Sequence, residues 1–481
     1  MFSFIMTVLL LLLFNDQFFV NCWSNSFFSE QLFTNTSDAN SLLLISFDGF
    51  RWDYIQSRRA KTPNFDRIIS EGVTVQRGLK NAFVTKTFPN HYTLVTGMWE
   101  ESHGIVGNQM YDPHLNQVFT PENISANSDP AWFDVGAEPI WVTNHLQKKG
   151  KSGVCMWVGG GAPVKKVHPD IFIPYNESFD DYNKIDTVVK WFSDDNPINL
   201  GLIYFDQPDA YGHKFGPDSS NVTEMIEHLD AVVGYLLEQL NKTSLLQKMN
   251  IILTSDHGFT NTPANKVIHL DKYVNSSLYN VSAFSPVALI WPLKGHFDTV
   301  YNGLKEGEAI DGNFSVYKKE DIPEYFHYKN NVRISPIIAV ADDTYSFGTK
   351  EYPYPEHELG NHGYNNSLQD MHPFFIAMGP SFKKNFSVET FNSVDIYPLL
   401  CHLLHLTPAP NNGSLDIVSQ LLIEEPTKIA VITLVTYILC ISLILIVAGV
   451  FSAATIYYWN RSKYSLYTSL TSSESPLHLE S

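Results

Sequence analysis

Cysteine is scarce in this chain of 481 residues, which contains four. Cys22 lies just after an N-terminal apolar run and Cys440 within a long apolar run near the C-terminus, so Cys155 and Cys401 are left for the part between them. Both lie in apolar runs, which favours buried free thiols over a disulfide bridge. The sequence therefore excludes a small disulfide-stapled module. The middle part, roughly 400 residues, is long enough to bury a large core without such bridges.

Basic residues are also few. The 32 lysines and arginines stand against 50 aspartates and glutamates, which gives a formal net charge of −18. No basic face is evident, and this argues against binding to a nucleic-acid polymer. Internal repeats, low-complexity tracts and Pro/Gly-rich linkers are missing as well, apart from the short stretch 408–413. One large domain is the simplest interpretation.

Both ends of the chain carry apolar segments. Residues 5–14 are apolar and a polar stretch follows, as in a secretory signal, although the usual basic residues are missing. Residues 429–458 are almost wholly apolar and long enough to span a membrane, and Arg461 and Lys463 follow on what we expect to be the cytoplasmic side. The expected organisation is a signal peptide (1–24), an N-terminal segment (25–40), an extracellular domain (41–415), a stalk (416–428), a transmembrane helix (429–458) and a cytoplasmic tail (459–481).

Glycosylation sequons agree with this type I topology. In the part expected to lie outside the cell, eleven asparagines precede x-Ser/Thr, a density that indicates a glycosylated cell-surface protein. Cleavage in the stalk would release a shed, secreted form. The sequon asparagines are Asn35, Asn123, Asn176, Asn221, Asn241, Asn275, Asn280, Asn313, Asn365, Asn385 and Asn412.

The domain alternates continuous apolar runs with amphipathic segments. The apolar runs predict strands buried on both faces, and 225–240 has apolar residues at helical spacing. This alternation predicts an α/β fold with a mostly parallel sheet, whose ligands bind at the carboxyl ends of the strands. The predicted strands are 42–47, 153–158, 200–205, 251–254 and 373–378.

Thr87 precedes a segment that we expect to be helical, with Pro89 tolerated in its first turn. As an N-cap, Thr87 would place its hydroxyl among free backbone N–H groups, where a helix favours a phosphate. By itself, this pattern is better explained as an ordinary helix cap.

Acidic residues follow three of the predicted strands. Asp48 ends the first strand, Asp209 follows another with His213 four residues later, and Asp256 with His257 ends a third. His362 lies in a similar Asn-His-Gly segment. Such residues are common in turns, but together they form the mixture of carboxylate and imidazole that zinc accepts.

Six segments in this order resemble the ectonucleotide pyrophosphatase/phosphodiesterase family, part of the alkaline phosphatase superfamily. The resemblance spans residues 41–410 and is greatest to the short, single-span members. It implies an alkaline-phosphatase-like sheet covered by helices on both faces. The segments are 48–51 (DGFR), 87–92 (TFPNHY), 101–108 (ESHGIVGN), 208–213 (PDAYGH), 255–258 (SDHG) and 362–364 (HGY).

The resemblance also implies a reaction centre with two zinc ions. Thr87 would be the nucleophile, activated by one ion, and Asn108 would donate to a phosphoryl oxygen, although by itself Asn108 reads as a turn residue. The implied ligands are Asp209, His213 and His362 for one ion, and Asp48, Asp256, His257 and the Thr87 oxygen for the other.

Substrate preference is less clear from the sequence. Phe88, Trp157 and Tyr175 occupy positions where relatives stack a base, but core packing is an alternative, especially for Trp157. Where relatives have Trp-Pro-Gly-Ser/Thr-Asp, this chain has a Gly-rich loop at 158–162. We therefore expect a zinc ectoenzyme that cleaves phosphodiester or pyrophosphate bonds of nucleotides or dinucleotides such as NAD. The alternatives are a lysophospholipid-type phosphodiesterase and a weakly active cell-surface interaction glycoprotein.

Overall fold

The computed structural model describes residues 41–355, 357–424 and 428–471. The chain forms two compact units that divide between Leu422 and Ile423. The expected signal peptide (1–24) and N-terminal segment (25–40), with Cys22 and Asn35, lie outside the described residues.

An eight-stranded sheet forms the centre of the first unit. Within the part of the chain that the structure describes, seven of these strands run parallel and β17 runs in the opposite direction. The prediction of a mostly parallel sheet is confirmed. In spatial order the strands are β18 (Phe386–Val388), β2 (Val73–Val75), β17 (Phe375–Met378), β8 (Met249–Thr254), β1 (Ser41–Phe47), β7 (Leu200–Phe205), β5 (Ser152–Cys155) and β6 (Ile171–Ile173).

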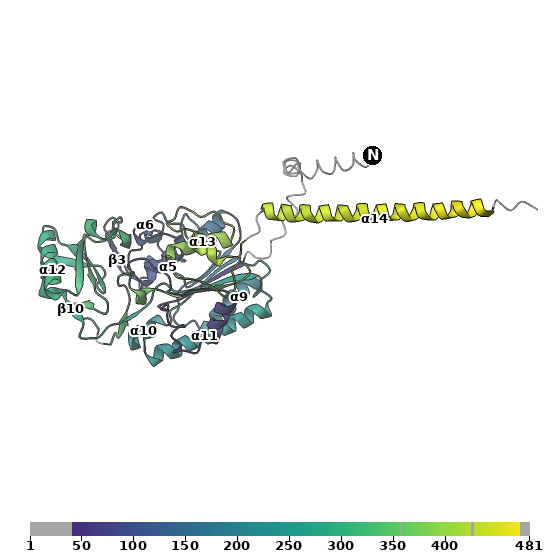
Figure 1. Ribbon diagram of the computed structural model, residues 1–481. Helices are drawn as coiled ribbons and strands as arrows, with labels where there is room; N and C mark the ends of the chain where they lie inside the picture. The colour runs from purple at the N-terminus through teal and green to yellow at the C-terminus, as the bar shows by residue number, and fades with distance from the viewer. Residues whose placement is uncertain (1–40, 356, 425–427, 472–481) are drawn as a thin grey trace, which may run out of the picture. The chain divides into compact units, whose positions relative to one another are not determined.

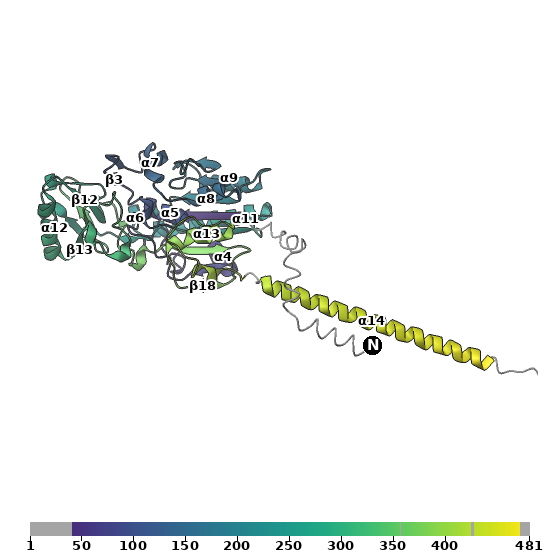
Figure 2. The same cartoon turned by 90° about the horizontal axis from the view of Figure 1, so that it is seen from above.

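Helices cover both faces of this sheet, as expected (Figures 1 and 2). Successive side chains of a strand point to opposite faces, so Leu42 and Leu44 join one buried core while Leu43 and Ile45 join another. The first core is completed by α5 (Thr87–Thr96), α8 (Ile140–Leu146) and α13 (Ile396–Leu403), and the second by α4 (Pro63–Glu71), α9 (Asp181–Ser193) and α11 (Ser220–Lys242).

Two predicted elements of the first unit differ from the structure by three or more residues at one end, and the ends of the other predicted strands agree to within two residues. Strand β5 stops at Cys155 and not at 158, because Met156 adopts a left-handed φ of 63° that breaks the extended chain. The helix predicted at 225–240 begins earlier, at Ser220, because the side chain of Ser219 accepts a hydrogen bond from the backbone N–H of Val222 and caps it.

A second, antiparallel sheet was not predicted. It consists of β11 (Tyr279–Val281), β12 (Val287–Pro292), β14 (Ile337–Ala341) and β13 (Phe314–Lys318), and α12 (Phe297–Asp311) packs on it around a separate core. The other described helices and strands are α6 (Glu100–His103), β3 (Met110–Asp112), β4 (Gln117–Phe119), α7 (Pro130–Phe133), α10 (Asp209–Phe215), β9 (Thr260–Asn261), β10 (Val267–His269), β15 (Ser346–Gly348) and β16 (Gly360–Asn361).

The first unit continues beyond the expected boundary at residue 415. Val418 and Leu421 are fully buried, so part of the expected stalk belongs to the compact unit. In the second unit, α14 (Lys428–Thr471) is one helix, and its segment Val435–Tyr464 is long and apolar enough to cross a membrane.

Cys155 and Cys401 are both buried and free, as the apolar surroundings predicted. Ten of the asparagines in the expected extracellular sequons lie in the described residues, and none of the ten is buried, so their side chains are accessible. Asn123, Asn176, Asn241, Asn275, Asn280, Asn385 and Asn412 are exposed, and Asn221, Asn313 and Asn365 are partly exposed.

Candidate functional site

Three neighbouring strands carry the predicted acidic residues to one edge of the central sheet. Strand β1 pairs in parallel with β7 on one side and β8 on the other, so their carboxyl ends lie together. Asp48 follows β1, and Asp256 and His257 follow β8. The His257 Nε2 atom lies 3.2 Å from Asp48 Oδ1 and 3.0 Å from Asp256 Oδ2.

The other predicted ligands reach the same place from different elements. Asp209 and His213 lie one turn apart on α10, which follows β7, and the His213 Nε2 atom is 3.5 Å from Asp209 Oδ2. His362 follows β16, which pairs with β9 just beyond His257. Its Nε2 atom is 3.5 Å from Asp209 Oδ1, and its ring stacks on that of His257 with centroids 3.5 Å apart.

Two groups of these side chains have the spacing of a metal site. Asp48, Asp256 and His257 form one group and Asp209, His257 and His362 the other, with potential ligand atoms within 4.8 Å of one another. The first group matches the set implied by the resemblance. In the second, His257 stands where His213 was expected, and His213 lies beside it on α10.

The hydrogen bonds around the site also suit a cation. Asp48 Oδ1, Asp209 Oδ1 and Asp256 Oδ2 are buried, and no described donor reaches them with hydrogen-bond geometry, although imidazole nitrogens lie 3.0–3.5 Å away. A buried carboxylate oxygen without a hydrogen bond is costly, and a bound cation removes that cost.

Neighbouring groups fix the direction of these ligands. The Nδ1 atom of His362 contacts the Thr85 carbonyl oxygen at 2.8 Å, which leaves Nε2 to face Asp209. The Tyr204 hydroxyl donates to Asp48 Oδ2 at 2.6 Å. Partners of this kind orient the ligands of metal sites, so the residues present fit a metal centre.

Electrostatics point the same way. Burial, together with repulsion from Asp256 and Asp209, raises the pKa of Asp48 to about 7. Burial opposes the charged form of His257, but Asp256 and Asp48 outweigh it and raise the pKa of His257 to about 10. Protons thus partly neutralise a dense group of carboxylates, a role that a bound metal cation can take over.

Thr87 lies at the edge of this group. It is the first residue of α5 and not its N-cap, since Lys86 has the extended backbone of the capping position and no side chain caps the helix. The prediction was thus wrong by one residue. The Thr87 Oγ1 atom lies 3.4 Å from His257 Nε2, so the hydroxyl still faces the metal-ligand candidates.

Asn108 is oriented by the start of α5. Its Oδ1 atom accepts a hydrogen bond from the Phe88 backbone N–H at 2.9 Å. Only the oxygen of an amide side chain can accept a hydrogen bond from an N–H group, so this contact identifies the atom that faces Phe88 as Oδ1. The Asn108 NH₂ group is left available to donate to a ligand.

The predicted base-stacking residues differ in accessibility. Tyr175 is 55% exposed and its hydroxyl donates to Asp206 Oδ2 at 3.0 Å. Phe88 is partly exposed and packs edge-on against Phe119. Trp157 is only 2% exposed, and its indole N–H donates to the His91 carbonyl oxygen at 3.1 Å. For Trp157 the structure favours the packing role that the sequence left open.

Close packing around the loop that follows Trp157 explains why glycine occupies two of its positions. A Cβ atom at Gly160 would lie 2.8 Å from the rings or methyls of Phe172 and Val154, and one at Gly161 would lie 2.9 Å from Ser128 Oγ. The Ser/Thr and Asp that relatives carry at these two positions would force their neighbours to move.

The sequence reasoning missed Lys86 and Glu358. The Lys86 Nζ atom donates to Asn361 Oδ1 at 3.0 Å. Burial lowers the pKa of Lys86 to about 8, although the negative charges of Glu358 and Asp209 act to raise it. Glu358 lies 3.1 Å from His213 Nδ1. A lysine directly before the candidate nucleophile was a readable signal, whereas Glu358 shows no local pattern.

Comparison with known proteins gives consistent matches. A profile of the type I phosphodiesterase / nucleotide pyrophosphatase family matches residues 42–365. Human ectonucleotide pyrophosphatase/phosphodiesterase family member 5 is 45% identical over 408 residues, which cover 85% of this chain and 83% of that protein. Human bis(5'-adenosyl)-triphosphatase ENPP4 is 42% identical over 398 residues, 81% of this chain and 85% of that protein.

Solved structures agree. The murine family member 5, crystallised as an inactive threonine-to-alanine variant in complex with AMP, is 44% identical and superposes with a TM-score of 0.76 over 80% of this chain and 100% of that structure. The human family member 5 structure gives the same TM-score of 0.76 at 45% identity and covers 80% of this chain and 100% of that structure. On the family match, the sequence identities and the shared fold, this chain belongs to the ectonucleotide pyrophosphatase/phosphodiesterase family, whose members are hydrolases of the type I phosphodiesterase and nucleotide pyrophosphatase class.

Proposed function

We propose that this protein is a zinc-dependent ectoenzyme that hydrolyses phosphodiester or pyrophosphate bonds of extracellular nucleotides or dinucleotides, NAD among them, with Thr87 as nucleophile. One observation carries the proposal: Asp48, Asp209 and Asp256 each have a buried carboxylate oxygen without a hydrogen bond, and these residues gather with His257, which the Thr87 hydroxyl contacts. The AMP complex of the murine relative supports a nucleotide substrate, and the inactivity of its threonine variant supports a threonine nucleophile.

Two zinc ions would be held by the residues of the candidate centre. Asp48, Asp256, His257 and the Thr87 oxygen would hold one, and Asp209, His213 and His362 the other. When bound, such ions lower the pKa of a hydroxyl group and offset negative charge on phosphoryl oxygens.

The chain's own groups divide the reaction into two displacements. Thr87 loses its proton to solvent and its Oγ1 bonds to phosphorus, while the bond from phosphorus to the leaving oxygen breaks and that oxygen keeps the electron pair. Water then bonds to phosphorus, the bond to Oγ1 breaks, and Thr87 regains a proton as the nucleoside monophosphate departs. The free NH₂ group of Asn108 donates to a phosphoryl oxygen as charge develops there.

Phe88 and Tyr175 would provide the contact surface for the base. We expect Tyr175→Ala to weaken kcat/KM for base-bearing diesters by about 1–3 kcal/mol, because it removes a stacking face, and to spare a small diester without a base. Tyr175→Phe keeps the ring and should stay close to wild type. Equal losses on both classes of diester in steady-state kinetics would make Tyr175 a packing residue.

The cellular setting is part of the proposal. We place the catalytic unit outside the cell, anchored by the apolar segment of α14 and carrying N-glycans on its accessible sequons. The expected partners are a small phosphodiester, the membrane and glycans, with no nucleic-acid polymer.

A substrate panel tests the function. Full-length protein in detergent, with Thr87→Ala as control, would be assayed on a chromogenic nucleotide diester, NAD and lysophosphatidylcholine. The proposal expects Thr87-dependent cleavage of the two nucleotide substrates. Cleavage confined to the lipid would support the lysophospholipid alternative, and no cleavage at all would support the interaction glycoprotein.

A further inference from the structure

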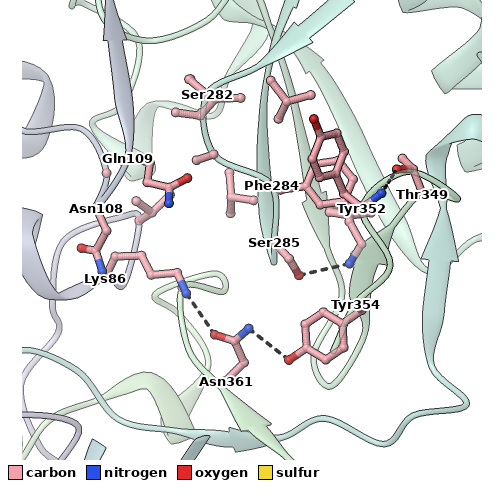
Figure 3. Close-up of a pocket in the computed structure, with 18 of the residues that line it drawn as sticks. Lys86, Asn108, Gln109, Ser282, Phe284, Ser285, Thr349, Tyr352, Tyr354 and Asn361 are labelled. Carbon is pink, nitrogen blue, oxygen red and sulfur yellow. Dashed lines mark hydrogen bonds between the residues drawn. The ribbon is translucent and has the colours of Figure 1, made fainter. Parts of the chain in front are cut away.

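A cavity of about 900 Å³ lies beside the catalytic residues and extends to the second sheet (Figure 3). Lys86, Asn108 and His213 line it on the catalytic side, and residues of the segments 279–287 and 351–355 line much of the remainder. Neither Phe88 nor Tyr175 is among its described lining residues, so it is separate from the proposed base contacts. Its volume falls in the range of small-molecule sites, about 300–1,000 Å³.

The order of the catalytic side chains places this cavity on the leaving-group side. Thr87 contacts His257, the His257 ring stacks on that of His362, and the His362 ring lies 5.2 Å from that of His213. His213, the last ring in this series of contacts counted from Thr87, lines the cavity. In an in-line displacement the leaving oxygen lies opposite the attacking oxygen, so the leaving group points to the His213 end.

The charges around the cavity limit what can leave. Lys86 is the one lysine or arginine among its described lining residues, whereas three carboxylates line it, from Glu122, Glu351 and Glu358. Lys86 is held in place by Asn361, which in turn donates to the Tyr354 hydroxyl at 3.2 Å (Figure 3). One phosphate can pair with Lys86, but further phosphates would share the cavity with three carboxylates and no second lysine or arginine among its described lining residues.

Aromatic rings line the part of the cavity beyond Lys86. Tyr352, Tyr354 and Phe284 lie there together in Figure 3. Tyr352 is 66% exposed, so its ring is free to stack on a ligand. Aromatic faces attract heteroaromatic rings, and nearby carboxylates add attraction when that ring is cationic.

We propose that this cavity is a second subsite that selects the leaving half of the substrate: one phosphate at Lys86 and a heteroaromatic ring against Tyr352, with Glu351 disfavouring polyphosphates. This inference rests on the proposed function and deepens it. It makes a diphosphate-bridged dinucleotide a better substrate than a nucleoside triphosphate.

Two matched substrates isolate the ring. NAD and ADP-ribose share one bond to be cleaved, but their leaving groups differ by the nicotinamide ring. Tyr352→Ala should lower kcat/KM for NAD about 5- to 150-fold more than for ADP-ribose, since a stacked ring contributes that much. Tyr352→Phe should keep the preference, and Tyr325→Ala, an exposed tyrosine outside the cavity, should change neither rate.

Charge reversal tests the exclusion of polyphosphates. Glu351→Lys should raise kcat/KM for ATP several-fold relative to ADP-ribose, because pyrophosphate then meets a cation. The control is Glu306→Lys on α12, an exposed site outside the cavity lining. An unchanged ATP to ADP-ribose ratio, or equal effects of Tyr352→Ala on NAD and ADP-ribose, would overturn the subsite while leaving the proposed function standing.

Direct binding separates the two claims. If wild-type protein cleaves none of the three substrates, the proposed function fails, and calorimetry with nicotinamide mononucleotide then decides the subsite. The subsite predicts binding that Tyr352→Ala weakens and Tyr175→Ala does not. Absence of binding, or binding that is independent of Tyr352, would contradict it.

Discussion

Thr87→Ala is expected to reduce kcat for nucleotide diesters on the order of 10³-fold or more, because it removes the oxygen that attacks phosphorus. The folded protein should tolerate the change. The hydroxyl makes one contact in the described structure, with His257 at 3.4 Å, so the free energy of unfolding should change by no more than about 0.5 kcal/mol. Steady-state kinetics and thermal unfolding of the same preparation measure both effects.

Thr87→Ser is the matched control. Serine keeps an oxygen at the position beside His257 and should retain measurable turnover, reduced because the methyl group no longer restricts the hydroxyl to one orientation. If the alanine variant turned over as fast as wild type, Thr87 would have no place in the chemistry. If serine were as inactive as alanine, an oxygen at this position would not be sufficient for turnover.

Removal of metal should have an effect of similar size. Chelation is expected to abolish hydrolysis and zinc to restore it, because the buried carboxylates of Asp48, Asp209 and Asp256 need a cation to offset their charge. Metal that binds only the native state also stabilises it, by about 4 kcal/mol at a free concentration of 1,000 Kd, so the melting temperature should fall on chelation. Metal analysis must accompany both measurements.

The substitution Asp209→Asn tests metal binding at a single candidate ligand. It should weaken metal retention and lower the melting temperature in zinc-containing buffer, whereas Asp194→Asn, at an exposed carboxylate far from any ligand candidate in sequence, should do neither. Hydrolysis by protein shown to be free of metal would refute the metal-dependent mechanism, and an unshifted melting temperature for Asp209→Asn would remove that residue from the ligand set.

Much of the catalytic edge could be predicted because it depends on local pattern. A buried apolar run followed by an acidic residue marks a strand end, and parallel strands bring such ends together, which is how Asp48, Asp209 and Asp256 came to be grouped. The pattern does not specify distances. It could not show that His257 belongs to both groups of possible metal ligands, the one with Asp48 and Asp256 and the one with Asp209 and His362. The position of His257 depends on the register of β1 against β8.

Other features depend on contacts between distant segments and leave little local signal. The second sheet joins short strands of mixed burial with long connections, and its role in lining the cavity beside Lys86 appears only in three dimensions. Trp157 was singled out because it occupies a position where relatives stack a base. Its indole instead packs edge-on against the His91 ring and donates to the His91 carbonyl oxygen.

The stereochemical course at phosphorus tests the central claim, attack by Thr87, most directly. A nucleotide diester with a chiral, isotopically labelled thiophosphate would be hydrolysed by the full-length protein, and the configuration of the nucleoside monothiophosphate product determined. Each in-line displacement inverts phosphorus, so transfer to Thr87 Oγ1 followed by attack of water predicts net retention. Net inversion would show that water attacks the substrate directly and would contradict a threonine nucleophile.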